Sequence, residues 1–224
     1  MSKTIAFIDA SNLFYGGEKS LGWKIDYEKL LTYLRQKYGI DHAFYFGGVE
    51  IHDFDFNYLT SETVPIAELE RYLVERVKNE GNDLDEATLL LIGRHLRRVR
   101  FYIKLQKFGY DLRLKPVKLY DQDDGTTKRK ANCDVDMAFY LMREKYNFDR
   151  VIILSGDGDF LPLLHYLRGT TGCRVDVMSF GKSTSAKLIE DADEFTDMDK
   201  DLRRYLLYTV PPKTGMNLSR LILR

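Results

Sequence analysis

The stretch RVIILSGDGDFLPLLHYLR, residues 150–168, decides the fold class of this chain. It opens with the predicted strand Arg150–Leu154, whose unbroken apolar run Val151–Leu154 is typical of a strand that is buried on both faces of a parallel sheet. A loop with two glycines and two aspartates follows, and the pattern after it predicts a helix over Asp157–Arg168, with Pro162 near its first turn. A strand, a tight polar loop and a helix in this order predict one unit of an α/β sheet.

The rest of the chain repeats this alternation of strand and helix. The predicted strands are Lys3–Asp9, Ala43–Val49, Asp111–Val117 and Arg174–Ser179, and the predicted helices are Asp26–Tyr38 with Asp26 as N-cap, Ile66–Lys78, Glu86–Phe108, Ala131–Tyr146 and Ser183–Asp191. We interpret Tyr120–Lys130 as a polar loop. Since every strand is followed by helical periodicity, we expect an α/β fold, a three-layer α/β/α sandwich around a central, mostly parallel sheet of five to six strands.

The length of 224 residues suits one domain with an insertion and a tail. We expect the domain to span residues 1–198. A helical insertion at about 52–98 interrupts the alternation. Residues 199–224 are rich in Lys and Arg and include Pro211 and Pro212, so we interpret them as a basic C-terminal tail outside the core.

Composition excludes several classes of protein. Lys+Arg and Asp+Glu both total 34, so a nucleic acid would need a local basic patch rather than a net positive charge. Cys133 and Cys173 form neither a zinc motif nor a redox pair and suit a reducing compartment.

The N-terminus does not resemble a signal peptide and no apolar run is long enough to span a bilayer, so we expect a cytoplasmic protein with no membrane partner. Phosphate-loop and dinucleotide fingerprints are missing from the sequence.

Acidic side chains follow the ends of two predicted central strands. Asp9 ends the first strand, with Asn12 three residues later, and Ser155, Asp157 and Asp159 follow Arg150–Leu154. Carboxyl ends of parallel strands meet at one sheet edge, where ligands bind. Carboxylates gathered there repel one another unless a cation neutralises them, and oxygen donors suit a hard cation. The alternative is that each aspartate caps the helix after it.

A third acidic segment, KANCDVDMA at residues 130–138, begins a predicted helix. Asp134 shares a helical stripe with Met137, Ala138 and Leu141, so it heads a face that otherwise packs inward. Asp136 lies about 200° further round the helix, so both carboxylates cannot point the same way. We favour Asp134 as the site residue; an N-terminal Asp stabilised by the helix dipole is the alternative.

Two basic segments are candidates for binding phosphate. Lys128, Arg129 and Lys130 precede the acidic helix, and Arg100 and Lys104 share a stripe of the long basic helix with Lys107. Either segment is also compatible with an ordinary solvated surface.

Together these motifs resemble the NYN domain family, the LabA-like branch of the PIN-like ribonucleases. The matching pieces are FIDASNLF at 7–14, KANCDVDMA at 130–138, VIILSGDGDFLPLLHYLR at 151–168 and RVDVMSFGKSTSAKLIEDADEFTDM at 174–198. The resemblance implies an α/β/α sandwich whose acidic residues bind divalent metal and cleave phosphodiester bonds. That role falls on Asp9, Asp134, Asp157 and Asp159, with Asn12 and Ser155 supporting.

The chain departs from the family at one position. Many members carry a second acidic residue on the middle helix where this chain has Tyr140. Asp136 lies one turn earlier and is a candidate to compensate. Without compensation the site would hold one metal ion rather than two, or catalysis would be weak.

We therefore expect a Mg²⁺- or Mn²⁺-dependent (endo)ribonuclease that acts on single-stranded or structured RNA. Cleavage of DNA and formation of a homodimer are left open. A non-catalytic RNA-binding module, a regulatory interaction protein and a hydrolase of small phosphate esters are the alternatives.

Overall fold

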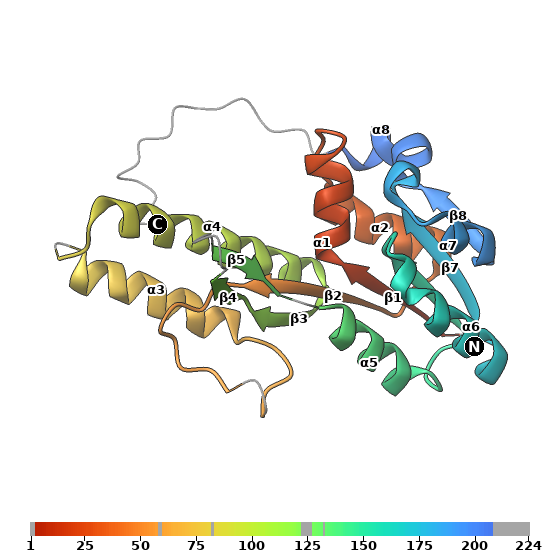
Figure 1. Ribbon diagram of the computed structural model, residues 1–224, viewed down its shortest axis with the longest axis horizontal. Coiled ribbons are helices and arrows are strands. Elements are labelled where there is room, and N and C mark those ends of the chain that lie inside the picture. The colour runs from red at the N-terminus through yellow and green to blue at the C-terminus, as the bar shows by residue number, and fades with distance from the viewer. Residues whose placement is uncertain (1–2, 58–59, 82, 122–126, 132, 208–224) are drawn as a thin grey trace.

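A computed structural model describes residues 3–57, 60–81, 83–121, 127–131 and 133–207; for 119–121, 127–130 and 204 it describes the backbone alone. Six parallel strands form one sheet in the order β3-β2-β1-β6-β7-β8 (Figure 1). The strands are β1 Thr4–Asp9, β2 His42–Val49, β3 Asp111–Pro116, β6 Arg150–Leu154, β7 Arg174–Ser179 and β8 Glu194–Asp197. This confirms the predicted parallel α/β fold.

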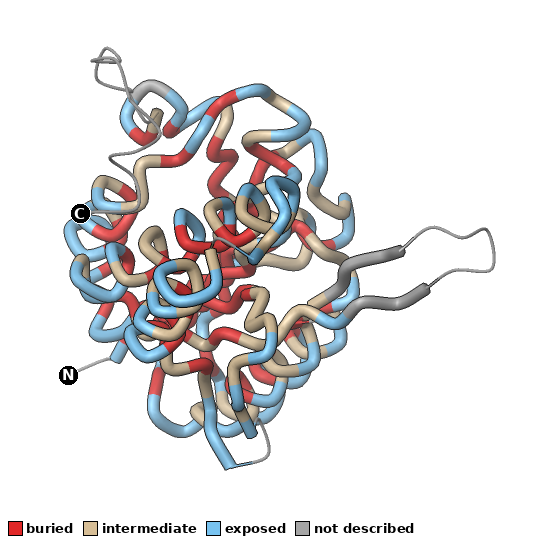
Figure 2. The backbone as a smooth tube through the Cα atoms, turned by 90° about the vertical axis from the view of Figure 1, so that its left-hand side faces the viewer, coloured by how far each residue is buried: buried red, intermediate tan, exposed pale blue. Residues whose placement is uncertain are grey.

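Helices cover both faces of the sheet and so produce three layers (Figure 1). The apolar residues form two separate clusters, one on each face. The cluster on one face includes Leu30 and Leu34 of α2 and Val99 of α4, whereas the other includes Met137 of α5 and Leu164 of α6. Figure 2 shows the buried positions gathered inside this shell.

The helices and helical turns follow in chain order. They are α1 Ala10–Leu13, η1 Phe14–Lys19, α2 Tyr27–Tyr38, α3 Ile66–Glu80, α4 Glu86–Phe108, α5 Asp134–Glu144, η2 Gly158–Phe160, α6 Leu161–Thr171, η3 Gly181–Ser183, α7 Ala186–Asp191, η4 Met198–Leu202 and α8 Arg203–Leu206. Asp26 caps α2 as predicted, because its carboxylate accepts hydrogen bonds from the backbone of Glu28 and Lys29. Gly39, at φ +63°, ends that helix in the left-handed conformation.

The α3–α4 pair occupies the predicted insertion and belongs to the core. Leu69 and Leu73 of α3 and Ile92 and Leu105 of α4 are fully buried in the same cluster as the residues of α2. The insertion therefore helps to cover one face of the sheet.

One prediction about local structure was wrong, and one predicted helix has different bounds. The polar segment 120–130 is no simple loop, since β4 Lys118–Asp121 and β5 Thr127–Lys130 pair as an antiparallel hairpin. A ladder of backbone hydrogen bonds can form without the apolar alternation that marks a half-buried strand. The helix expected over Asp157–Arg168 begins as the turn η2, continues as α6 and ends at Thr171.

The predicted tail also differs from expectation over its first residues. Leu202 and Leu206 are buried in the core, and the carbonyl of Leu206 accepts a hydrogen bond of 2.7 Å from the backbone of Asp26. Residues 200–207 are therefore part of the domain, because two leucines spaced four apart share one helical face. Over the residues described, no helix is long and apolar enough to cross a membrane.

Candidate active site at the carboxyl edge of the sheet

Asp9 is the last residue of β1 and lies at the carboxyl edge of the sheet, where it is only 4% exposed. Its Oδ1 accepts hydrogen bonds from the backbone of Ser11 at 3.0 Å and of Asn12 at 3.1 Å. Its Oδ2 accepts one from the Ser155 hydroxyl at 3.0 Å. Asp9 therefore caps α1, which was the alternative interpretation, and its second oxygen faces the end of β6.

The electrostatic surroundings of Asp9 are unfavourable to its charge. Burial raises the pKa of Asp9, and the negative charge of Asp134 raises it further, against the hydrogen bonds from Asn12, Ser155 and Ser11. Within the described part of the chain, no Lys or Arg contacts this carboxylate. Asp9 is thus a buried carboxylate with an acidic neighbour and, over the described side chains, no basic partner.

Asp134 begins α5 and lies close enough to influence Asp9. Met137 and Leu141, which share its stripe, are fully buried, as predicted. Asp136 instead forms an ion pair with Lys115 of β3, with 2.6 Å between Oδ2 and Nζ. Because Lys115 already offsets the charge of Asp136, this residue is poorly placed to replace a missing ligand.

Asn12 and Ser155 connect the loops that follow β1, β6 and β7. The Asn12 Oδ1 accepts hydrogen bonds from the backbone of Gly156 at 2.9 Å and from the Ser179 hydroxyl at 3.2 Å. Ser155 is completely buried, donates to Asp9 and accepts from the backbone of Asp157 at 3.2 Å. Both residues fix loop positions rather than offering a free oxygen.

The loop glycine is required by close packing. A Cβ on Gly156 would lie 2.8 Å from both the Ser179 and the Thr184 hydroxyl oxygens and 3.0 Å from the Thr184 Cα. A larger residue would therefore displace the loop that carries Asp157.

Asp157 and Asp159 are the more solvent-accessible of the predicted acids. Asp157 Oδ1 accepts a hydrogen bond of 3.0 Å from the backbone of Asp159, so Asp157 also caps the turn η2. Asp157 is partly exposed and Asp159 is exposed. Among the residues described, no three His, Cys, Asp or Glu side chains lie close enough to hold a metal ion. The structure thus couples Asp9 with Asp134, but it does not gather all four predicted carboxylates into one cluster.

Tyr140 stands where an acidic residue was expected from the family, and it packs in the core. It is 5% exposed, and its ring centroid lies 6.0 Å from that of Phe44 and 5.6 Å from that of Phe46. The guanidinium of Arg143 lies 4.0 Å from the ring centroid. This position supplies packing and no carboxylate.

A groove of about 760 Å³ adjoins the acidic edge and contains two predicted substrate-binding residues, Arg100 and Lys104. Arg97 and Arg98 also line it; neither was among the predicted substrate-binding residues, although Arg97 lies seven residues before Lys104 and therefore on the same face of α4. Arg100 donates a hydrogen bond of 2.8 Å to Glu70. The side chains of Lys128, Arg129 and Lys130 lie outside the described part of the structure.

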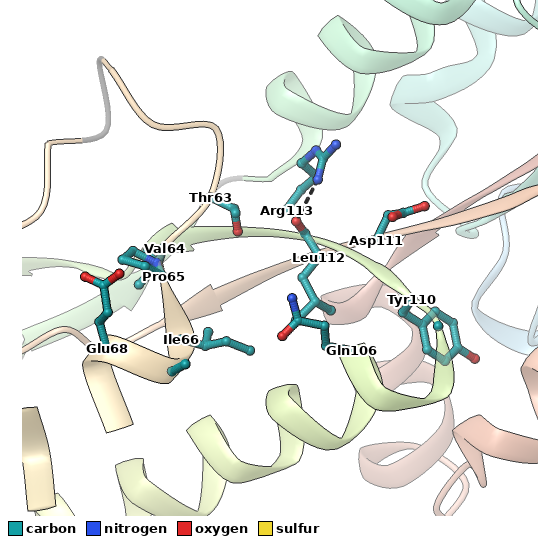
Figure 3. Close-up of a pocket in the computed structure, with 12 residues that line it drawn as sticks. Thr63, Val64, Pro65, Ile66, Glu68, Gln106, Tyr110, Asp111, Leu112 and Arg113 are labelled. Atoms are coloured by element: carbon teal, nitrogen blue, oxygen red, sulfur yellow. Dashed lines mark hydrogen bonds between the residues drawn. The ribbon is translucent and has the colours of Figure 1, made fainter. Parts of the chain in front are cut away.

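A smaller hollow of about 420 Å³ lies between β3 and the start of α3 (Figure 3). Its lining includes none of the predicted site residues. Arg113 turns from β3 toward α5, where its guanidinium lies 4.9 Å from the Tyr140 ring centroid. The hollow is on the outer side of β3 and is separate from the acidic edge.

The sequence matches the NYN domain model over residues 3–199. The chain belongs to the NYN domain family. It is 22% identical over 216 residues to the low amplitude and bright protein LabA of Synechococcus elongatus, which covers 95% of this chain and 91% of that protein. The name of that NYN domain relative states no reaction.

A solved structure shares the fold of this NYN domain protein. A protein of unknown function from Vibrio parahaemolyticus has a TM-score of 0.60 and 21% identity, covering 92% of this chain and 96% of that one. The T5 5′-exonuclease with bound zinc has a TM-score of 0.44 and 15% identity, covering 84% of this chain and 60% of that one.

Proposed function

We propose that this protein is a divalent-metal-dependent nuclease that hydrolyses phosphodiester bonds, with RNA as its preferred substrate and endonucleolytic cleavage. The observation that carries the proposal is Asp9: a buried carboxylate at the carboxyl edge of the sheet, next to Asp134 and without a basic partner among the residues that the structure describes. Such an arrangement costs stability unless a cation offsets the charges, and sites of this kind concentrate where chemistry is done.

The residues present fit Mg²⁺ or Mn²⁺. Carboxylate oxygens are the ligands that these hard cations prefer. Within the described residues Oδ2 of Asp9 accepts one hydrogen bond, so it keeps a lone pair for a ligand. Asp9 and Asp134 would hold the ion, and Asp157 and Asp159 would join from the loop after β6. A bound divalent ion would supply an activated water and offset negative charge on the reacting phosphate. Because the structure couples two carboxylates, Asp9 and Asp134, rather than all four, we expect one bound ion rather than two.

The other residues of the edge have positioning roles. Ser155 orients the Asp9 carboxylate, and Asn12 holds the loop after β6 against the loop after β7. Substrate phosphates would be held by Arg100 and Lys104 and by the Lys128–Lys130 segment, because the protein has no net positive charge to attract a polyanion.

Cleavage of end-labelled RNA and DNA in Mn²⁺, Mg²⁺ or EDTA tests the proposal. We expect cleavage that needs metal and falls at least 100-fold in Asp9→Asn, because a neutral amide binds a divalent cation much more weakly than a carboxylate. Asp157→Asn should lower it too. The matched control is Asp83→Asn, an exposed residue between α3 and α4, which should cleave like the wild type. Full activity in a folded Asp9→Asn protein would reject the assignment.

A second candidate is a non-catalytic RNA-binding or regulatory protein of the same fold. Tyr140 favours it, since the position contributes core packing instead of a carboxylate. Binding of RNA in EDTA, together with no cleavage in Mn²⁺ by the wild type, would select this candidate.

A further inference from the structure

The groove beside the acidic edge begins next to Asp9 and Asp134, the residues to which we assign metal binding. Its lining includes Ala10 and Ser11, which directly follow Asp9, and Ala131, three residues before Asp134. From there the groove runs between α4 and the segment that leads from α1 to the start of α2. Any molecule that fills the groove therefore reaches the carboxyl edge of β1.

One stripe of α4 faces this groove and alternates cations with aromatic rings. Arg97, Phe101, Lys104 and Phe108 all line it, and their spacing of four, three and four residues places them on one side of the helix. Arg97 and Lys104 are exposed, and the Lys104 ammonium lies 5.3 Å from the centroid of the Phe108 ring. Within the described residues, no carboxylate pairs with either cation.

The opposite wall offers an aromatic ring to solvent and is more acidic than basic, with Glu18, Asp26 and Glu28 against Lys24. Tyr15 is 63% exposed, and its ring stands edge-on to that of Phe14, with 5.4 Å between the centroids. Lys24 on this wall pairs with Glu18 at 3.4 Å, and Asp26 is occupied in capping α2. The groove is therefore positive along α4 and aromatic on both sides.

Close packing holds the α4 wall at a fixed place beside the edge. Tyr102 is buried, and its hydroxyl donates a hydrogen bond of 2.7 Å to the carbonyl of Gly48 at the end of β2. A Cβ on Gly48 would lie 2.5 Å from that of Ala131. Tyr102 thus anchors α4 to the end of β2, and the missing side chain of Gly48 leaves room for Ala131 at the edge.

We propose that this groove binds a single-stranded segment of nucleic acid that continues from the cleaved bond, with phosphates on Arg97 and Lys104 and a base stacked on Tyr15. This inference rests on the proposed function, because it assigns the groove to the substrate of the same edge. A duplex keeps its bases stacked inside the helix, so the exposed aromatic ring of Tyr15 would have no base to stack on. A single strand offers phosphates and base faces together, which is what a cationic and aromatic groove binds.

Fluorescence anisotropy with labelled RNA and DNA oligonucleotides tests the inference. Each is used single-stranded and as a duplex, in EDTA so that cleavage plays no part. The groove variant is Arg97→Glu with Lys104→Glu; the control is Arg94→Glu with Lys107→Glu, which makes the same charge change at exposed positions of the same helix outside the groove. Circular dichroism confirms that each variant is folded.

We expect the groove variant to bind the single strand at least 10-fold more weakly, whereas the control changes affinity less than 3-fold. The slope of log affinity against log salt should fall by about 1.4 in magnitude for two lost phosphate contacts. Tyr15→Ala should weaken binding roughly 5- to 100-fold with little change in that slope, since stacking is not ionic. Comparing RNA with DNA shows which strand the groove prefers.

Equal losses in the groove and control variants, equal or tighter binding of the duplex, or no binding of any oligonucleotide would overturn the inference. Different outcomes would reject the proposed nuclease activity and the proposed groove. Single-strand binding through Arg97 and Lys104 without cleavage in Mn²⁺ would keep the groove and reject the nuclease. Cleavage that survives unchanged in the groove variant would keep the nuclease and reject the groove as the site of the strand.

Discussion

Asn12→Ala removes the side chain that joins three loops of the carboxyl edge. The lost Oδ1 accepts hydrogen bonds of 2.9 Å from the Gly156 backbone and 3.2 Å from the Ser179 hydroxyl. A lost hydrogen bond costs about 1 kcal/mol net, and a buried N–H left without a partner costs about 1–3 kcal/mol. Gly156 is buried, so we expect the free energy of unfolding to fall by about 2–3 kcal/mol.

Urea denaturation followed by far-UV circular dichroism measures this loss. At this chain length the expected decrease in melting temperature is about 4–12 °C, from about 2–4 °C per kcal/mol. Cleavage should fall as well, because the loop that carries Asp157 loses its anchor. Asn147→Ala is the control: that residue is exposed, its side chain bonds Glu144 alone among the residues described, and the change should stay within about 0.5 kcal/mol.

A double-mutant cycle with Ser179→Ala tests the assigned partners. Ser179→Ala alone should cost about 1 kcal/mol, and clearly less in the Asn12→Ala background, because its acceptor is already gone. Additive losses, or a loss below about 0.5 kcal/mol for Asn12→Ala, would refute the idea that Asn12 holds the edge together.

Two further predictions concern the opposite side of the molecule. Asp176→Asn should lower the free energy of unfolding by about 3 kcal/mol in a denaturation experiment, because this buried carboxylate bonds Arg150 and Arg174; a change below about 1 kcal/mol would show that the network contributes little. Burial raises the pKa of Cys173 to about 12 from 9.0, so alkylation of the folded protein at pH 8, followed by mass spectrometry, should be about 1,000-fold slower than in urea. Rapid labelling of the native thiol would contradict that burial.

Local sequence determined most of the fold. The apolar run Val151–Leu154 and the strand ending at Asp9 became adjacent central strands, because only strands covered on both faces tolerate such continuous hydrophobicity. The inward stripe of Asp134, Met137 and Leu141 followed from helical geometry alone. The hairpin of β4 and β5 did not follow, since its pairing uses backbone groups that side-chain patterning does not reveal.

Only the tertiary structure decided which basic side chain offsets the charge of which acidic side chain. The sequence supplied the acids, but spacing could not show that Lys115 pairs with Asp136 while Asp9 has Asp134 beside it and no basic partner among the residues described. It also could not place Arg97 and Lys104 across from Tyr15, because that groove depends on how α4 packs against β2. Periodicity along a chain fixes which face a residue occupies; charge balance and grooves depend on distances between elements far apart in sequence, and those arise only on folding.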